Sequence, residues 1–320
     1  MNLAELKQRL AVPVIGAPLF IVSNPDLVIA QCKAGIVGAF PALNARPAEQ
    51  LELWLKRITE ELDAYNQANP DRPAAPFAVN QIVHKSNGRL EHDLELTIRY
   101  RAPIVITSLG ARSDLNDAVH GYGGMVLHDV INQKFAHKAI EKGADGLILV
   151  AAGAGGHAGV QSPFALVQET RQWFDGPIAL SGAIATGRSV LAARAMGADF
   201  AYVGSAFIAT REANASDAYK QALVEGTADD IVYSNLFTGV LGNYHRRSIV
   251  NAGLDPDNLP TSDASKMSFA AGANPAAKAW RDIWGCGQGI GAITDVPSAT
   301  ERVERLIREY RDAKRALLEG

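Results

Sequence analysis

Short apolar runs alternate with longer amphipathic segments along the first two thirds of the chain. Eight of these runs are bounded by glycine, proline or polar residues and have the length of buried strands. They lie at residues 12–17, 36–40, 77–82, 103–107, 125–128, 146–152, 177–181 and 199–204. The segments between them carry apolar residues at helical spacing, as in Leu51, Leu55 and Ile58. Helices are accordingly expected at residues 25–34, 47–67, 89–101, 115–122, 133–142, 163–173 and 187–196.

This alternation of strands and helices predicts a parallel sheet. Eight strand–helix units favour a closed (β/α)8 TIM barrel over an open doubly wound sheet, although periodicity alone leaves the choice open. A chain of 320 residues has room for a barrel of roughly 250 residues plus an insertion. The fold class is therefore predicted as an α/β barrel.

The alternation stops after residue 211. Helical patterns follow at residues 216–225, 275–284 and 298–318, and a long polar segment occupies residues 251–265. We therefore expect two domains. Residues 1–210 and 285–320 form the barrel, with the last helix packed on its wall. Residues 211–284 form a mainly helical cap that serves as the substrate domain.

Composition excludes several classes of protein. The formal net charge is −3 and no dense basic patch occurs, which argues against a nucleic-acid partner. No run of 18 apolar residues and no signal-peptide pattern is present, so neither a membrane span nor secretion is expected. The two cysteines, Cys32 and Cys286, lie far apart and without metal-ligand spacing. These features predict a cytoplasmic protein without a metal site.

A glycine-rich stretch follows the sixth apolar run and contains His157. Gly155 and Gly156 let the backbone approach a ligand without interference from Cβ atoms. His157 is thus placed at the carboxyl end of a strand, the edge that carries the chemistry in parallel α/β folds. A histidine with an ordinary pKa of about 6.5 suits proton abstraction near neutrality. The alternative is a loop histidine with only local hydrogen bonds, and His128, at the end of the fifth strand, is a comparable candidate.

Two further glycine turns follow the seventh and eighth strands. Gly182 with Ala183, and Gly204 with Ser205, can direct backbone N–H groups at one phosphate, and Ser181 adds a hydroxyl. Each turn alone is equally explained as a tight connection. The glycines around residue 155 lack the G-x-G-x-x-G spacing, so a dinucleotide fold is not expected.

Other polar residues are expected at the same rim. Asn80 and Thr107 end buried strands and can bind a polar ring edge or only cap the following loop. The tail at residues 284–291 is either a flexible linker or a closing loop in which Gln288 touches a ligand. A polar cluster at residues 244–247 could contact an anionic substrate, although a solvated face is the simpler explanation.

Three blocks of sequence carry a family resemblance. They are GADGLILVAAGAGGHAG, PIALSGAIATGRSVLAARAMGADFAYVGSAFIAT and the tail GCGQGIG, supported more weakly by PVIGAPL, FAVNQI and PIVITS. With these blocks the chain resembles the nitronate monooxygenase family, formerly called 2-nitropropane dioxygenases. The resemblance implies an FMN-binding TIM barrel that oxidises alkyl nitronates with O₂.

The resemblance also assigns residues. His157 occupies the histidine of the family's GGHxG motif and would be catalytic, placing or deprotonating the substrate. Leu19 departs from the methionine of many relatives but keeps its apolar bulk. The residues expected to contact FMN are Ala17, Pro18, Leu19, Asn80, Thr107, His128, Gly155, Gly156, Ser181, Gly182, Ala183, Gly204, Ser205 and Gln288.

The predicted function is therefore FMN-dependent oxidation of a small anionic nitronate by O₂, with a homodimer left open. One alternative is an NAD(P)H-dependent flavin reductase of quinones or enoyl thioesters on the same scaffold, because the loops around a cofactor choose the substrate. A flavin-free barrel that binds phosphosugars is a second alternative. An aldolase-like version of it would want a lysine at a strand end, and none of the predicted strands ends in one.

Overall fold

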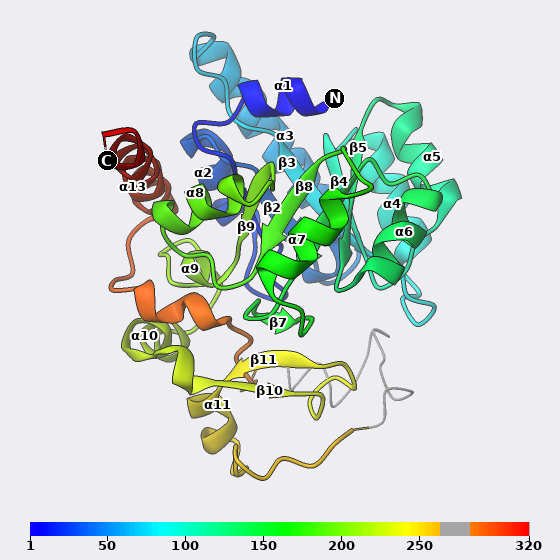
Figure 1. Cartoon of the computed structure of the whole chain (residues 1–320). Helices are drawn as coiled ribbons and strands as arrows, with labels where there is room; N and C mark the ends of the chain where they lie inside the picture. The colour runs from blue at the N-terminus through cyan, green and yellow to red at the C-terminus, as the bar shows by residue number, and fades with distance from the viewer. Residues whose placement is uncertain (263–281, 320) are drawn as a thin grey trace.

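A computed structural model describes residues 1–262 and 282–319, and eight parallel strands form its centre (Figure 1). The hydrogen-bonded order is β1, β9, β8, β6, β5, β4, β3 and β2. A parallel bridge between Ile15 and Val37 joins the two ends of this order, so the sheet closes into a barrel. The strands are β1 (Val14–Gly16), β2 (Gly38–Pro41), β3 (Phe77–Ile82), β4 (Ile104–Ser108), β5 (Met125–Val130), β6 (Gly146–Val150), β8 (Ile178–Ser181) and β9 (Phe200–Val203). The predicted (β/α)8 barrel is confirmed.

Helices surround the barrel as the amphipathic segments predict. They are α2 (Pro25–Ala34), α3 (Gln50–Ala68), α4 (Leu90–Arg99), α5 (Ser113–Gly121), α6 (Gln133–Glu141), α7 (Pro163–Arg171), α8 (Gly187–Ala195) and α13 (Ala299–Glu319), with short turns η1 (Ala42–Asn44) and α9 (Ser205–Ile208). The C-terminal helix α13 packs against α2 and α8, so the last segment of the chain fills the place in the ring beside the first strand (Figure 1).

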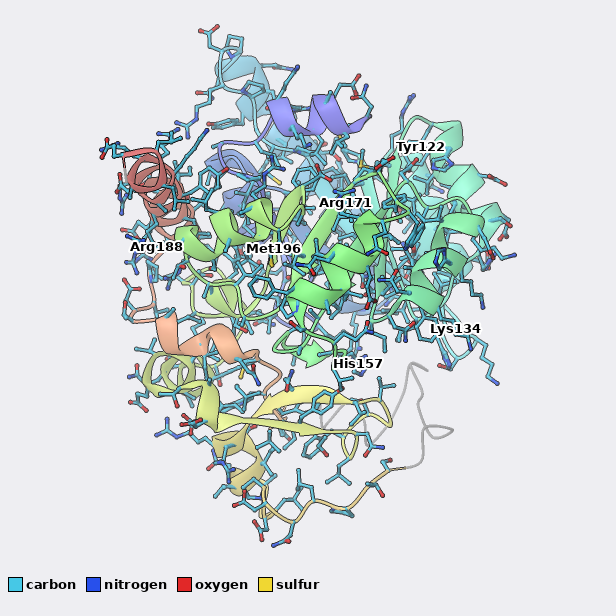
Figure 2. All side chains as sticks on the ribbon, viewed as in Figure 1. Tyr122, Lys134, His157, Arg171, Arg188 and Met196 are labelled. Carbon is cyan, nitrogen blue, oxygen red and sulfur yellow. The ribbon has the colours of Figure 1, made fainter. Side chains whose placement is uncertain are left out.

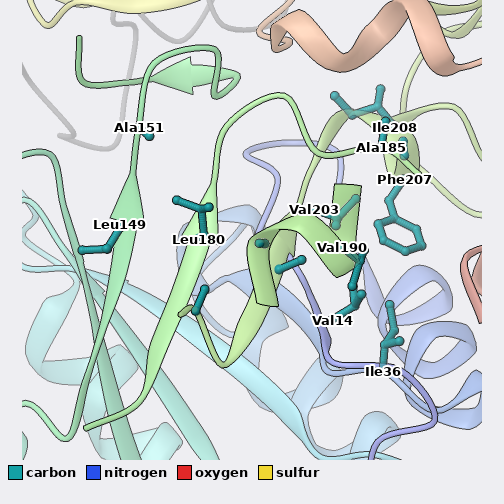
Figure 3. Packing of buried hydrophobic residues seen from close by; sticks show 14 of the residues in the cluster. Val14, Ile36, Leu149, Ala151, Leu180, Ala185, Val190, Val203, Phe207 and Ile208 are labelled. Atoms are coloured by element: carbon teal, nitrogen blue, oxygen red, sulfur yellow. The ribbon is translucent and has the colours of Figure 1, made fainter. Parts of the chain in front are cut away.

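Two apolar layers hold the barrel together. One lies between strands and helices, and Figure 3 shows part of it, where Val14, Val203 and Phe207 are packed near Val190 of α8. The other fills the barrel interior with alternate strand residues such as Ile15 and Ile148. The helix α1 (Leu3–Gln8) contributes the fully buried Leu6 to this interior, so it closes the end of the barrel opposite the cap (Figure 1). These layers leave the carboxyl ends of the strands available for a site.

The cap contains a β-hairpin that the sequence analysis did not predict. Its described elements are α10 (Asp217–Glu225), η2 (Ala228–Asp230), β10 (Ile231–Ser234), β11 (Gly242–His245) and α11 (Arg246–Asn251). The strand β11 pairs antiparallel with β10 on one side and with β7 (Gly156–His157) of the glycine-rich stretch on the other. The expectation of a mainly helical cap thus missed this sheet, because each of its strands is short and the second, Gly-Asn-Tyr-His, lacks an apolar alternation.

Part of the predicted cap lies outside the described residues. The helix expected at 275–284 falls there except for its last three positions, and so does the end of the polar segment at 251–265. Residues 288–292 form a short turn, η4 (Gln288–Ala292), on the barrel rim. In the part of the chain that the structure describes, no helix is long and apolar enough to cross a bilayer.

Candidate active site

A cavity of about 540 Å³ opens at the carboxyl ends of the strands, a volume within the usual range of ligand sites. The loops after the barrel strands form its floor and walls, and residues of the cap and the C-terminal tail complete it. All the predicted site residues except Thr107 and Gln288 line this cavity: Ala17, Pro18, Leu19, Asn80, His128, Gly155, Gly156, His157, Ser181, Gly182, Ala183, Gly204 and Ser205.

Thr107 lies behind the cavity wall and contacts a residue that lines it. The β4–β5 register places Thr107 directly beside His128, and the Thr107 Oγ1 atom lies 2.5 Å from Nδ1 of His128. Burial lowers the pKa of His128 to about 4, with the positive charge of Lys138 acting in the same direction. Thr107 therefore orients a neutral histidine, whereas the sequence analysis expected it to contact a ligand itself.

The C-terminal tail returns to the rim, as the closing-loop interpretation predicts. The N–H of Gln288 donates to the carbonyl oxygen of Gly153 at 2.9 Å, and the N–H of Gly287 donates to Ser205 Oγ at 2.9 Å. A Cβ atom at Gly287 would collide with the Gly153 carbonyl, so the two glycine-rich segments meet backbone to backbone. The Gln288 residue itself is exposed and does not line the cavity, so its predicted contact with a ligand has no support from its position.

His157 lies where the barrel rim meets the cap hairpin (Figure 2). Its Nε2 atom is 3.0 Å from Oγ1 of Thr238, and that hydroxyl in turn donates to the carbonyl of Val240 at 3.0 Å. Because the Thr238 hydroxyl proton is used in the bond to Val240, the Thr238 oxygen accepts a hydrogen bond from His157. Nε2 of His157 therefore carries the imidazole proton, and Nδ1 is the basic nitrogen. Burial lowers the pKa of His157 to about 4. The side chain is therefore neutral at pH 7, in the state that can accept a proton.

The turns after β8 and β9 form one end of the cavity and present hydrogen-bond donors. Gly182 and Ala183 both adopt positive φ values, +142° and +55°, which bend the chain sharply over the strand end. The N–H of Ala183 donates to the carbonyl of Gly153 at 3.2 Å, so the structure corrects the expectation that this N–H is available to a phosphate. Ser205 Oγ accepts from Gly287, which leaves the hydroxyl proton for a ligand. Among the described residues of these turns, the N–H groups of Gly182 and Gly204 and the Ser205 hydroxyl remain as hydrogen-bond donors at this end of the cavity.

The carboxyl ends of β3, β4 and β5 form the other end of the cavity, where three polar side chains are hydrogen-bonded in a row. Asn80 Nδ2 donates to Ser108 Oγ at 2.7 Å, and Ser108 Oγ donates to Asp129 Oδ2 at 2.6 Å. Burial raises the pKa of Asp129 to about 6, against the lowering effect of the Ser108 hydrogen bond. We call Asn80, Ser108 and Asp129 the floor chain.

The sequence analysis missed Ser108, Asp129 and Lys138. Ser108 and Asp129 each follow a residue that was singled out, Thr107 and His128, so the end of a parallel strand offered two candidates and only the first was taken. Lys138 lies on α6 and provides the one lysine or arginine among the described residues that line the cavity. No strand-end pattern marks it, because it comes from a helix and reaches the rim only in the folded barrel.

The polar cluster of the cap is engaged within the cap. Arg246 forms an ion pair with Asp257 at 2.8 Å, and Arg247 forms one with Glu225 at 2.8 Å. Tyr244 and His245 are buried, and none of the four residues lines the cavity. These contacts favour the structural interpretation of the cluster over contact with a substrate. Across the described residues, no group of three histidine, cysteine, aspartate or glutamate side chains is arranged to hold a metal ion.

The fold is a closed (β/α)8 barrel with a cavity at its carboxyl rim. A strand-end histidine and donor turns after the last two strands line this cavity, so the fold and site define a barrel enzyme that works on a ligand at that rim. The sequence model described as nitronate monooxygenase matches residues 4–309. The chain therefore belongs to the nitronate monooxygenase family, and it is an oxidoreductase.

Individual relatives agree with this placement. The chain is 26% identical to a nitronate monooxygenase of Paraburkholderia phytofirmans, over 94% of this chain and 93% of the relative. Among solved structures, a nitroalkane oxidase from Streptomyces ansochromogenes superposes with a TM-score of 0.81 at 22% identity, covering 98% of this chain and 99% of that one. An enoyl reductase domain of MlnA from Bacillus amyloliquefaciens superposes with a TM-score of 0.69 at 16% identity, covering 99% and 98%. These two structures show a shared fold.

Proposed function

We propose that this protein oxidises alkyl nitronates with O₂, using bound FMN. The observation that carries the proposal is that one cavity joins the donor turns after β8 and β9 to His157 in a chain of this family. FMN has a phosphate at one end and a flat polar ring at the other, so it needs donors at one place and a roomy cavity beyond. Gly182, Gly204 and Ser205 supply those donors, and the cavity of about 540 Å³ continues from them across the barrel.

The residues of the chain divide the remaining tasks. FMN, when bound, accepts electrons from the nitronate and passes them to O₂. Lys138 supplies positive charge to attract an anionic substrate into a cavity that otherwise holds a carboxylate. His157 is neutral and its Nε2 proton is held by Thr238, so the imidazole can place the nitronate, or accept a proton from the carbon that bears nitrogen when the substrate enters as the neutral nitroalkane.

An absorbance spectrum of the purified protein, followed by anaerobic addition of propyl nitronate, tests this function. Flavin absorption that changes with nitronate alone, and oxygen consumption when air is admitted, are expected. A protein that cannot take up FMN contradicts the proposal. So does bound flavin that nitronate leaves unchanged.

The second candidate is an NAD(P)H-dependent flavin reductase of enoyl thioesters or quinones. It is favoured by the likeness to the MlnA enoyl reductase domain over nearly the whole chain. Bleaching of the flavin by NADPH in the absence of air, with no response to nitronate, would establish it in place of nitronate oxidation.

Two further expectations accompany this proposal. A cytoplasmic location fits the two cysteines, which are both buried free thiols, Cys32 and Cys286. The homodimer remains a prediction that size-exclusion chromatography with light scattering would test.

A further inference from the structure

The two ends of the cavity lie on opposite sides of the barrel. In the closed strand order β8 lies four places from β3, and β9 lies four places from β4. The donor turns follow β8 and β9, whereas the floor chain comes from β3, β4 and the neighbouring β5. A ligand whose phosphate lies at the donor turns and that extends across the rim therefore reaches the floor chain with its far end.

The hydrogen bonds of the floor chain run in one direction. Asn80 Nδ2 also donates to the carbonyl of Ile106 at 3.1 Å, and because a carbonyl only accepts, this bond fixes which side-chain atom is the amide nitrogen. The second Nδ2 proton goes to Ser108 Oγ, and the hydroxyl proton of Ser108 goes to Asp129. The side-chain N–H and O–H protons of Asn80 and Ser108 are thereby all used in hydrogen bonds within the protein. What remains for a ligand are acceptors, the second carboxylate oxygen of Asp129 and the side-chain oxygen of Asn80.

Asp129 forms no ion pair with any residue that the structure describes. Among the described residues, no lysine, arginine or histidine nitrogen forms an ion pair with its carboxylate, and it is the one carboxylate that lines the cavity. The titratable or charged groups around it are His128 on the same strand, Lys138 on α6 and Tyr202 on β9. Burial raises the pKa of Tyr202, and the negative charge of Asp129 acts in the same direction. A carboxylate in this position is stabilised best by an N–H group of the ligand itself.

The oxidised ring of a flavin carries a single N–H, the imide N3–H, at the end of the ring system farthest from the fused benzene ring and between two carbonyl groups. We propose that Asp129 is the residue that recognises this imide N–H, with Ser108 and Asn80 holding its carboxylate in place. The inference rests on the proposed binding of FMN and adds the residue that fixes the orientation of the ring. Asp129 is then a positioning residue for the cofactor, and the acceptor oxygens of Asp129 and Asn80 face the one donor of the ring.

Methylation of N3 provides the test, because it removes the proton without changing the phosphate. The dissociation constants of FMN and of N3-methyl-FMN are measured by quenching of flavin fluorescence, with the full chain freed of flavin. The proteins compared are the wild type, Asp129→Asn, Asp129→Ala and the control Asp175→Asn. Asp175 is an exposed residue between α7 and β8, at the opposite end of the barrel, so its substitution removes a charge far from the cavity.

The wild type and Asp175→Asn are expected to prefer FMN over the methylated form by about tenfold or more, the usual effect of a lost hydrogen bond to a charged group. In Asp129→Asn the Ser108 hydroxyl holds the amide oxygen, so an N–H₂ group faces the ring and the preference falls to about threefold or less. Asp129→Ala has room for the methyl group and loses the preference in the same way. Asn has the same shape as Asp, so this variant is expected to fold, which a circular dichroism spectrum checks.

Three results would overturn the inference. A preference that is equal in the wild type and Asp129→Ala, with FMN bound to both, overturns this inference alone and leaves FMN binding intact. Absence of any preference in the wild type does the same, whether or not the variants fold. Failure of the wild type to bind FMN at all removes the proposed function, and this inference with it.

Discussion

The two ends of the cavity are built from different parts of the chain. The end after β8 and β9 presents donors from backbone N–H groups and one hydroxyl, in turns that require positive φ values at Gly182 and Ala183. The end at β3 to β5 presents acceptors from side chains, ordered by the bonds that lead from Asn80 to Asp129. The same barrel edge can therefore bind an anion on one side and an N–H group on the other, because loop backbone sets the polarity of one end and strand-end side chains set that of the other.

The largest effect is expected between these ends, at His157. His157→Asn should lower kcat/KM for a neutral nitroalkane by roughly 10²–10⁴-fold, because the general base that would convert it to the nitronate is lost, while FMN affinity stays within about twofold. Steady-state oxygen consumption and flavin titration measure the two quantities. The matched control His137→Asn, an exposed histidine of α6 outside the cavity, should change neither. Unchanged kcat/KM in His157→Asn would remove this residue from the mechanism.

Substitutions in the donor turns after β8 and β9 should mainly weaken the binding of FMN. Gly182→Asp adds a negative charge and a side chain where we place the phosphate, and at a φ of +142° the new residue is also strained. We expect FMN affinity to fall by about 100-fold or more, since like charges oppose each other in a partly enclosed site. Ser205→Asp should act in the same way. Flavin retained after gel filtration is the measurement, and Gly121→Asp, which adds the same charge on a helix end with open space around it, is the control. Full occupancy in both cavity variants would contradict the phosphate assignment.

A smaller effect is expected where the cap holds His157. Thr238→Val removes the acceptor of the Nε2 proton, a hydrogen bond worth roughly 1 kcal/mol, so kcat should fall about fivefold with little change in FMN affinity. Thr238→Ser keeps the hydroxyl and should restore the rate. If Thr238→Val and Thr238→Ser behave alike, the hydroxyl does not orient the imidazole.

The smallest effect is expected from pH at the acceptor end. Burial raises the pKa of Asp129 to about 6, so its carboxylate is ionised and accepting above that pH and gains a proton below it. The preference for FMN over its N3-methyl form should therefore be complete near pH 7.5 and fall severalfold by about pH 5. Both ligands carry the same phosphate, so its titration cancels in the ratio of their two dissociation constants. A ratio that rises on acidification would show that the protonated acid is the binding form.

The sequence predicts the barrel well because its evidence is local. Each strand is a short apolar run that can be recognised from its own residues. Glycine turns such as those at Gly182 and Gly204 likewise indicate the rim from local sequence alone. The position of His157 at the rim is predictable for the same reason, because the glycine-rich stretch around it follows an apolar run.

Relations between distant residues escaped prediction. The N–H of Ala183 donates to the carbonyl of Gly153, some 30 residues away in a different loop. No pattern in either segment predicts this hydrogen bond. The role proposed for Asp129 rests on its hydrogen bond with Ser108 of the neighbouring strand and on the lack of an ion pair with any described residue, and both depend on how side chains are arranged across the rim. The hairpin β10–β11 was missed because its pairing with β7, at His157, lies between segments far apart in the chain.

The contacts of the tail with Gly153 and Ser205 have a consequence for the synthesis of the protein. The Gly287 and Gln288 backbones complete the rim, and α13 completes the ring of helices behind it, so one C-terminal segment finishes both parts of the fold. A chain emerging from the ribosome lacks this segment until after all eight barrel strands have been made. Completion of the rim and of the ring of helices is therefore a long-range event that follows the synthesis of all eight barrel strands.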